Sequence, residues 1–174
     1  NHSLCEHAFH IVGAADHTTL KNNQIFNFNA AVKGSGLGNG NARSFPDDVL
    51  IQNNSFFNTS HRNTSNPVTL IDVVGGDRWV IKQNLIADFF KHKGDQISYG
   101  AFLKGNGSEG LFEQNLVVCE MGLTANRGIQ IGLSFGGGGS ESSHCQKTTC
   151  QTEHRNGTMR NNIIMNCSRD VGIY

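Results

Sequence analysis

A repeated ten-residue pattern constrains the fold of this chain more than any other feature of its sequence. Successive copies start 31, 30, 31 and 47 residues apart, so three spacings are nearly equal and one is longer. A period of ~30 residues is typical of solenoid proteins, in which a single repeat cannot bury its apolar face and stacked repeats share one core. The copies align without gaps and cover residues 18–27, 49–58, 79–88, 110–119 and 157–166.

Two apolar columns run through the aligned copies. Their apolar stretches are short, rich in β-branched and aromatic residues, and interrupted by amides. A helical repeat would instead show apolar residues at helical spacing over ten or more residues. The pattern therefore predicts a strand, a turn and a second strand in every copy. The first column is Leu20, Ile51, Ile81, Phe112 and Met159, and the second is Ile25, Phe56, Ile86, Val117 and Ile164.

Between the two apolar columns lies a position that is asparagine in every copy. Asparagine tolerates the left-handed backbone conformation better than other non-glycine residues, which suits a tight corner. At such a corner, each side-chain amide can hydrogen-bond the next coil, as in the ladders of stacked strands. We therefore predict a structural ladder, and not a catalytic role, for Asn23, Asn54, Asn84, Asn115 and Asn162.

The repeat predicts an all-β fold, a right-handed parallel β-helix of about five coils with a ~30-residue repeat. We expect one domain over residues 1–174, with a loop insertion at 136–157, and coils near residues 18–48, 49–78, 79–109, 110–156 and 157–174. The chain is expected to be an excerpt of a longer helix, because no capping helix precedes the first coil and the last coil stops inside a strand. A further strand in each coil is expected at residues 31–33, 68–72, 101–104, 128–131 and 171–174.

The charges of the chain sum to zero, with 14 basic and 14 acidic residues. Phosphate binding needs a basic excess or a basic stripe, so we do not expect nucleic acid as a partner. The longest apolar runs cover only a few residues, so no membrane span is expected either.

The cysteines indicate where the protein resides. Cys145 and Cys150 lie in one short loop and are expected to form a local disulfide, which fits a secreted, periplasmic or cell-surface protein. A zinc cluster of these two cysteines with His144 and His154 is the alternative. Cys119 and Cys167 follow the second apolar column and are expected to be ordinary core residues.

Coils of the NNxI type, the Lys-Gly-Asn turn at residues 104–106 and the ending DVGIY at 170–174 resemble bacterial right-handed parallel β-helix proteins. Among enzymes, the chain is similar to the chondroitinase-B-like and alginate-lyase-like β-helices. That resemblance implies a lysine base, here Lys104, and an arginine about one coil later, here Arg127, as acid or charge stabiliser. It also implies acidic calcium ligands just before the lysine. Only Asp95 occurs in that stretch, so the ligands of a calcium cofactor are not identified.

We therefore expect an exported, carbohydrate-active protein, and, if it is an enzyme, a lyase that cleaves an acidic, uronate-containing polysaccharide by β-elimination. Such a reaction needs a base and cations that neutralise the uronate carboxylate. Arg78 and Asp72 are the expected substrate-binding residues, and an arginine can hold a carboxylate through two hydrogen bonds. Asp72 ends the strand one coil before Lys104, and pairing between them would raise the pKa of the lysine and indicate a structural ion pair.

Three aromatic residues are candidates for contact with a sugar. Tyr99 and Phe135 are candidates for stacking on sugar rings, and Trp79 is a third, although it starts a strand and also fits the core.

The alternative function is that of a non-catalytic structural, adhesive or filament-forming β-helix that self-associates. A cationic groove around Lys104, Arg127 and Asp72 would favour the enzyme, whereas paired charges there would favour the structural protein.

Overall fold

Parallel strands make up most of the chain. The computed structural model describes residues 5–39, 42–125, 127–137, 139–147 and 149–167. Within these ranges a short 3-10 helix, η3 (Ser142–His144), lies in a loop. None of the helices in the described ranges has the length and apolar character needed to cross a membrane.

Fifteen strands form three parallel sheets of five strands each. Sheet I consists of β1 (His7–Val12), β4 (Ala30–Ser35), β7 (Val68–Val74), β10 (Ile97–Lys104) and β14 (Ile129–Ser134). Sheet II consists of β2 (Thr19–Lys21), β5 (Leu50–Gln52), β8 (Val80–Lys82), β12 (Leu111–Glu113) and β16 (Thr158–Arg160). Sheet III consists of β3 (Gln24–Phe26), β6 (Ser55–Phe57), β9 (Leu85–Ala87), β13 (Leu116–Val118) and β17 (Ile163–Met165). A small sheet pairs β11 (Gly107–Ser108) with β15 (His154–Arg155).

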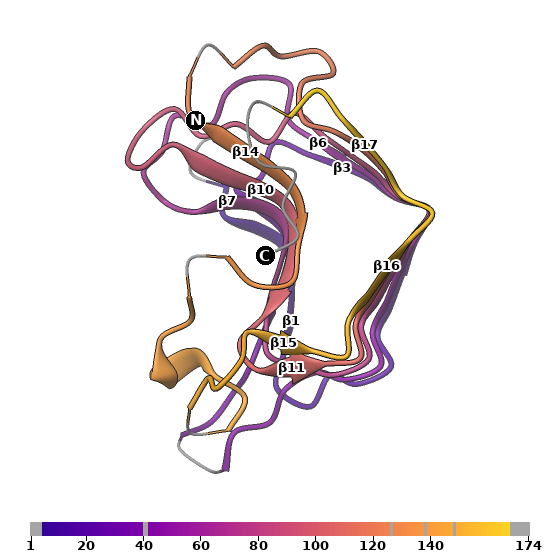
Figure 1. Cartoon of the computed structure of the whole chain (residues 1–174), viewed down its shortest axis with the longest axis vertical. Coiled ribbons are helices and arrows are strands. Elements are labelled where there is room, and N and C mark those ends of the chain that lie inside the picture. Colours follow the sequence, from indigo (N-terminus) through magenta and orange to yellow (C-terminus); the bar gives the residue numbers. More distant parts are fainter. Residues whose placement is uncertain (1–4, 40–41, 126, 138, 148, 168–174) are drawn as a thin grey trace.

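The strands stack copy upon copy, in the register that the repeat predicts. Leu20 pairs with Ile51, and Ile51 pairs with Ile81, so each apolar column runs straight through sheet II. In Figure 1 the strands of each sheet lie one behind another, and sheets II and III meet at a sharp corner. The predicted all-β class with stacked parallel strands is thus confirmed, and the arrangement is consistent with a parallel β-helix.

The further strand predicted in each coil is found in sheet I. Residues 31–33, 68–72 and 101–104 lie within β4, β7 and β10. The segment predicted at 128–131 corresponds to β14, which begins one residue later and extends to Ser134. The fifth predicted segment, 171–174, lies outside the described residues.

The apolar columns form the core between the three sheets. Ile51, Ile81 and Phe112 of the first column are completely buried, as are Phe56 and Ile86 of the second. Trp79 is also buried, and its indole nitrogen donates a 2.7 Å hydrogen bond to the carbonyl oxygen of Pro46. The alternative in which Trp79 stacks on a sugar ring is therefore excluded by its burial.

The corner between sheets II and III uses two adjacent amide columns for two different purposes. In every copy of the repeat, the residue before the recurring asparagine has a left-handed backbone, with φ between 54° and 60°. These residues are Asn22, Asn53, Gln83, Gln114 and Asn161. The left-handed residue turns the chain, which leaves the following asparagine free to point along the stack.

The asparagine ladder predicted from the sequence is present at this corner. The Oδ1 atom of Asn84 accepts a 2.9 Å hydrogen bond from the backbone nitrogen of Asn54, and its Nδ2 donates a 3.0 Å bond to the carbonyl oxygen of Ile51. Asn54, Asn115 and Asn162 make the equivalent two bonds to the preceding coil. Every coil junction is therefore closed by the same pair of bonds, and Asn54, Asn84 and Asn115 are buried while they make them.

Replacing a buried rung should cost far more stability than replacing an end rung. Asn84→Ala removes the side-chain acceptor of the Asn54 backbone nitrogen and a side-chain donor to the carbonyl of Ile51, so we expect a loss of about 3 kcal/mol in unfolding free energy. Asn23→Ala removes a part-exposed amide that accepts no bond from a preceding coil and should cost about 1 kcal/mol. Urea unfolding followed by circular dichroism measures both; equal losses would contradict the ladder as the source of this stability.

One expectation about the cysteines was wrong. Cys119 and Cys167 are joined by a disulfide that spans 48 residues, and they are not free core thiols. They lie at the same corner in two stacked copies, where the backbone nitrogen of Cys119 bonds the carbonyl oxygen of Met165, so their Cα atoms are only 4.8 Å apart. The register of the coils, which fixes this distance, is what allows the two sulfurs to bond.

Candidate functional site

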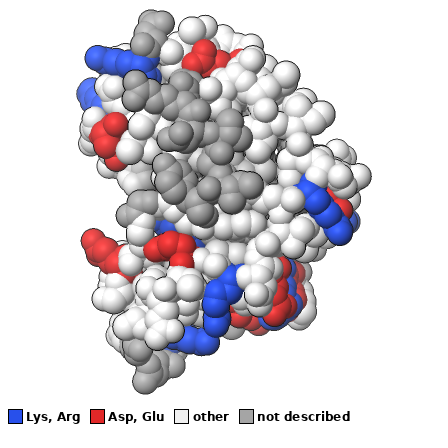
Figure 2. All heavy atoms as spheres, in the orientation of Figure 1, with Lys and Arg blue, Asp and Glu red and all other residues white. Residues whose placement is uncertain are grey.

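The outer face of sheet I is hollowed, and two adjoining cavities of about 430 and 380 Å³ lie in it. Loops border the hollow at both ends of the strands, as Figure 1 shows for the ribbon and Figure 2 for the surface. The two cavities share Lys33, Val74 and Lys104. Together they have the size of a typical small-molecule or sugar site, for which ~300–1,000 Å³ is usual.

We name the two cavities by the side chains that line them. The basic cavity, of about 430 Å³, is lined by His10, Lys33, Arg43, Lys104, Glu141 and His144, among others. The aromatic cavity, of about 380 Å³, is lined by Pro67, Asp72, Lys91, Asp95, Tyr99 and Phe102, among others.

A change in strand alternation makes sheet I hollow on its outer side. Tyr99, Phe102 and Lys104 of β10 line the cavities, whereas Ala101 and Leu103 belong to the core. Strict alternation would put Tyr99 on the same face as Ala101, so the chain shifts by one residue between them. Gly100 occupies this point, and a Cβ atom there would lie 2.5 Å from the carbonyl oxygen of Gly132. Glycine thus permits the close approach of two strands where the sheet bends around the hollow.

Lys104, the predicted base, lies where the two cavities meet. Its Nζ atom is 3.5 Å from the carbonyl oxygens of Gly137 and Gly139 and lies 4.6 Å from the centre of the Phe102 ring. Burial lowers the pKa of Lys104 below its ordinary value, and the nearby charges of Asp72 and Glu153 oppose that change. Among the described residues Lys104 has no carboxylate within ion-pair distance, so its amine is held by weak contacts only.

Asp72, a predicted substrate-binding residue, pairs with a different lysine. Its Oδ1 atom is 2.8 Å from the Nζ atom of Lys33. Strand register explains the pairing, because His10, Lys33, Asp72 and Phe102 occupy one outward-facing column across four strands. Asp72 therefore influences Lys104 only through its charge, and the direct ion pair that the sequence suggested is formed by Lys33 instead.

The other two sequence-predicted residues lie outside both cavities. Arg78 holds Asp48 through two hydrogen bonds of 2.7 and 2.9 Å and contacts Asp47 at 3.3 Å. The Arg78 guanidinium keeps the pKa of Asp48 below its ordinary value. Arg127 is exposed, 3.3 Å from the Nε2 atom of His92, and precedes β14 at the end of sheet I opposite Lys104. The structure therefore does not bring Arg127 and Lys104 together.

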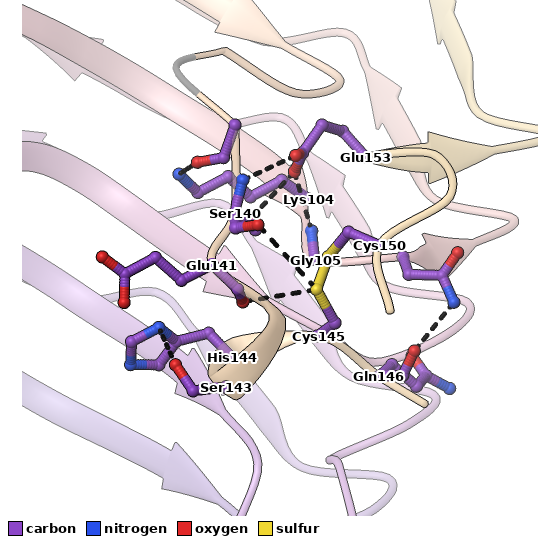
Figure 3. The surroundings of a disulfide bond; sticks show 12 residues. Lys104, Gly105, Ser140, Glu141, Ser143, His144, Cys145, Gln146, Cys150 and Glu153 are labelled. Carbon is purple, nitrogen blue, oxygen red and sulfur yellow. Dashed lines mark hydrogen bonds between the residues drawn. A yellow bond between two sulfur atoms is a disulfide. The ribbon is translucent and has the colours of Figure 1, made fainter. Parts of the chain in front are cut away.

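The loop of residues 136–157 forms one wall of the basic cavity. The predicted disulfide between Cys145 and Cys150 is confirmed, and Figure 3 shows it behind Ser140, Glu141 and His144. Because both sulfurs are used, the alternative zinc cluster loses two of its ligands. Among the described residues no group of three or more histidine, cysteine or acidic side chains could hold a metal ion, and Asp95 is paired with Lys91 at 2.5 Å.

Two side chains fasten this loop to the strands beneath it. The Oε1 atom of Gln146 accepts a 2.8 Å bond from the backbone nitrogen of Gly76, and its Nε2 donates a 3.0 Å bond to Asp77. The carboxylate of Glu153 accepts bonds from the backbone nitrogens of Gly105 and Ser140 at 3.2 and 2.7 Å (Figure 3). The wall of the cavity is thus attached to the turn that follows Lys104.

His154 holds the other end of the loop and is neutral in the folded protein. Its ring stacks on Phe135 with 4.8 Å between centres, and its Nε2 atom accepts a 3.0 Å bond from the backbone nitrogen of Gly110. Burial lowers the pKa of His154 to about 4. The ring of Phe135 is therefore occupied by its contact with His154. Of the three aromatic candidates for sugar stacking, only Tyr99 lines either of the two cavities.

The His154 environment predicts a pH-dependent stability. The unfolded histidine, with a pKa near 6.5, gains a proton at higher pH than the folded one, so stability is complete above pH 6.5 and falls as the pH decreases toward 4. His154→Gln keeps an acceptor for Gly110 but does not titrate in this range, so its urea midpoint should fall less between pH 6.5 and 4. Equal pH slopes for the variant and the native protein would contradict this assignment.

A second polar ladder, which sequence analysis missed, lies at the corner before sheet II. The Oδ1 atom of Asp16 accepts a 2.8 Å bond from the backbone nitrogen of Asp47, Asp47 does the same for Asp77, and Asp77 accepts from the Ser108 hydroxyl. Their spacings of 31, 30 and 31 match the repeat and could have revealed this column. The residues that follow this column, among them His17, Asp48 and Arg78, have left-handed backbones.

Comparisons of the chain with protein-family models, with curated proteins and with solved structures found no match. The resemblance to chondroitinase-B-like and alginate-lyase-like β-helices therefore stays a prediction. The evidence for function comes instead from the hollow on sheet I, with its two cavities and the amine of Lys104 between them.

Proposed function

We propose that this chain is an exported right-handed parallel β-helix that binds an acidic polysaccharide in the hollow of sheet I. One observation carries the proposal: the two cavities adjoin along the strands of sheet I and share Lys33 and Lys104. A chain of sugars is longer than one cavity, and adjoining cavities provide consecutive subsites. The right hand follows from the strong preference for right-handed connections between parallel strands, and export from the two disulfides.

Lys104 is the residue that we propose to act as base if the bound polysaccharide is cleaved. In β-elimination the base removes the proton on the carbon next to the uronate carboxylate, the electron pair forms a carbon–carbon double bond, and the bond to the glycosidic oxygen breaks. A lysine whose pKa is lowered is a better base near neutral pH. Arg43 lines the basic cavity with Lys104 and supplies positive charge that stabilises the dianionic intermediate, in place of Arg127.

The first test is binding and cleavage of alginate, pectate and chondroitin sulfate by the native protein and Lys104→Met, with calcium supplied. Loss of one charge-assisted contact should weaken binding about tenfold, and the absorbance of unsaturated uronate at ultraviolet wavelengths should disappear. Lys21→Met is the matched control, because Lys21 is an exposed lysine on sheet II, away from the hollow. Isothermal titration gives the affinities.

The outcomes separate binding from cleavage. Failure of the native protein to bind any of the three polymers would overturn the proposal. Binding that weakens in Lys104→Met but not in Lys21→Met, without an absorbance change, would support the binding function and reject β-elimination. Equal weakening in both variants would show that the hollow is not the binding site.

One observation favours the alternative function, a structural or adhesive protein that self-associates. The outer side of sheet III carries a row of apolar side chains, and Phe26, Leu116, Ile163 and Met165 are 39–59% exposed. Leu116 pairs with Ile163 across neighbouring strands, and the rings of Phe26 and Phe57 stack 5.5 Å apart. A second copy of the chain presents the same uncharged row, so two copies could bury it against each other.

Sedimentation velocity tests this alternative directly. If sheet III mediates self-association, the sedimentation coefficient of the native protein should rise with concentration, and Ile163→Lys should abolish the rise because two copies would place like charges together. A native protein that stays monomeric up to ~100 μM would remove the alternative, since association of an apolar face of this kind is typically micromolar.

A further inference from the structure

The two cavities of the hollow differ in how their charges are balanced. In the aromatic cavity, Lys91 is paired with Asp95 at 2.5 Å, and Asp72 neutralises Lys33 at 2.8 Å. The rings of Tyr99 and Phe102, which contact each other edge to face at 5.3 Å, also line this cavity, and Lys104 is shared with the basic cavity. This cavity therefore offers apolar rings, two ion pairs and the shared amine of Lys104.

The basic cavity has an excess of cations. Arg43 and Lys104 both line it, and Glu141 is the acidic side chain in its lining, whereas Lys33, which also lines it, is paired with Asp72. Arg43 makes its contacts with neutral groups, since it donates to the carbonyl oxygen of Ser143 and lies over the ring of Phe45 at 5.3 Å. Neither Arg43 nor Lys104 is neutralised by a carboxylate within ion-pair distance among the described residues.

Two histidines line the same cavity. The Nε2 atom of His10 lies 2.8 Å from the hydroxyl of Ser35, and His144 belongs to the loop of residues 136–157. Figure 3 shows the side chains of Lys104, Glu141 and His144 on the same side of the loop, away from the disulfide. The lining side chains thus come from three separate places, namely sheet I, the loop containing Arg43 and the loop of residues 136–157, and they surround one space.

We propose that the basic cavity is the subsite for the anionic group of the sugar, a sulfate ester or a carboxylate, and that the aromatic cavity takes the adjoining sugar ring. This assignment rests on the proposed polysaccharide binding and adds which cavity holds the anionic group and which holds the adjoining ring. Arg43 provides a guanidinium charge for the anion, and Lys104 provides a second, compact charge. The cavity volume of about 430 Å³ accommodates one charged sugar unit.

His10 makes this subsite sensitive to pH. Burial, the neighbouring His7 and Lys33 lower the pKa of His10 below its ordinary value, while the charge of Asp72 opposes that change. His10 gains its proton as the pH falls, and the extra charge strengthens attraction for an anion. Sulfate and uronate keep their own charge down to pH 5, so affinity should rise as the pH falls from 7 to 5.

The test uses sodium sulfate and sodium galacturonate as separate probes, with the whole chain and sodium chloride at matched ionic strength. Imidazole resonances of His10 and His144 are followed by NMR, and both should shift saturably with each probe. Arg43→Gln should weaken affinity about tenfold, Arg43→Lys should retain most of it, and Lys21→Gln should leave it unchanged. His10→Gln should remove most of the gain in affinity between pH 7 and 5.

Each result supports or overturns the assignment. Shifts no larger than those with chloride, or equal effects of Arg43→Gln and Lys21→Gln, would overturn it. A saturable, Arg43-dependent site in a protein that binds no polysaccharide would support the anion subsite and reject the proposed function. Polysaccharide binding that does not change with Arg43→Gln or with pH would support the proposed function and reject the anion subsite. Sulfated and desulfated chondroitin then show which of the two anions the site prefers.

Discussion

Stacking of one coil on the next is the interaction on which every other feature of this protein depends. Parallel strand pairing supplies the bonds along three sheets, and the asparagine ladder adds two bonds at one corner of every junction. These bonds satisfy backbone groups that would otherwise be buried without partners, at a cost of about 1–3 kcal/mol each. Because one register applies to all three sheets, the position of every side chain relative to the next coil is set by its place in the repeat.

The hollow of sheet I shows what that register does to charged residues. It places Lys33 beside Asp72 in one outward column, and this pairing leaves Lys104 without a carboxylate partner. Lys104 is part-buried there, and burial lowers the pKa of its amine while the charge of Asp72 opposes that change. A single shift in register would put Asp72 on the core side, and the charge pattern that distinguishes the two cavities would be lost.

The loops turn this face of the sheet into a site. The loop that follows β14 is fastened by a disulfide, by Gln146 and by Glu153, so its wall of the basic cavity is held by fixed contacts. Its contacts reach Gly76 and Gly105, which lie in turns of two different coils. A solenoid with regular coils alone would present an open sheet, and the insertion is what encloses the space around Lys104.

The sequence by itself determined the repeat, the stacked strands, the apolar core columns, the asparagine ladder and the disulfide between Cys145 and Cys150. All of these depend on neighbours one coil away or a few residues away, and the ~30-residue spacing reports such neighbours directly. Tertiary structure alone decided the disulfide between Cys119 and Cys167, the pairing of Asp72 with Lys33, the separation of Arg127 from Lys104, and the enclosure of the hollow. The physical reason is that the outward face of a strand and the docking of an irregular insertion have no period in the sequence. Cys167, moreover, lies one residue beyond its aligned copy, so only the folded register shows its partner.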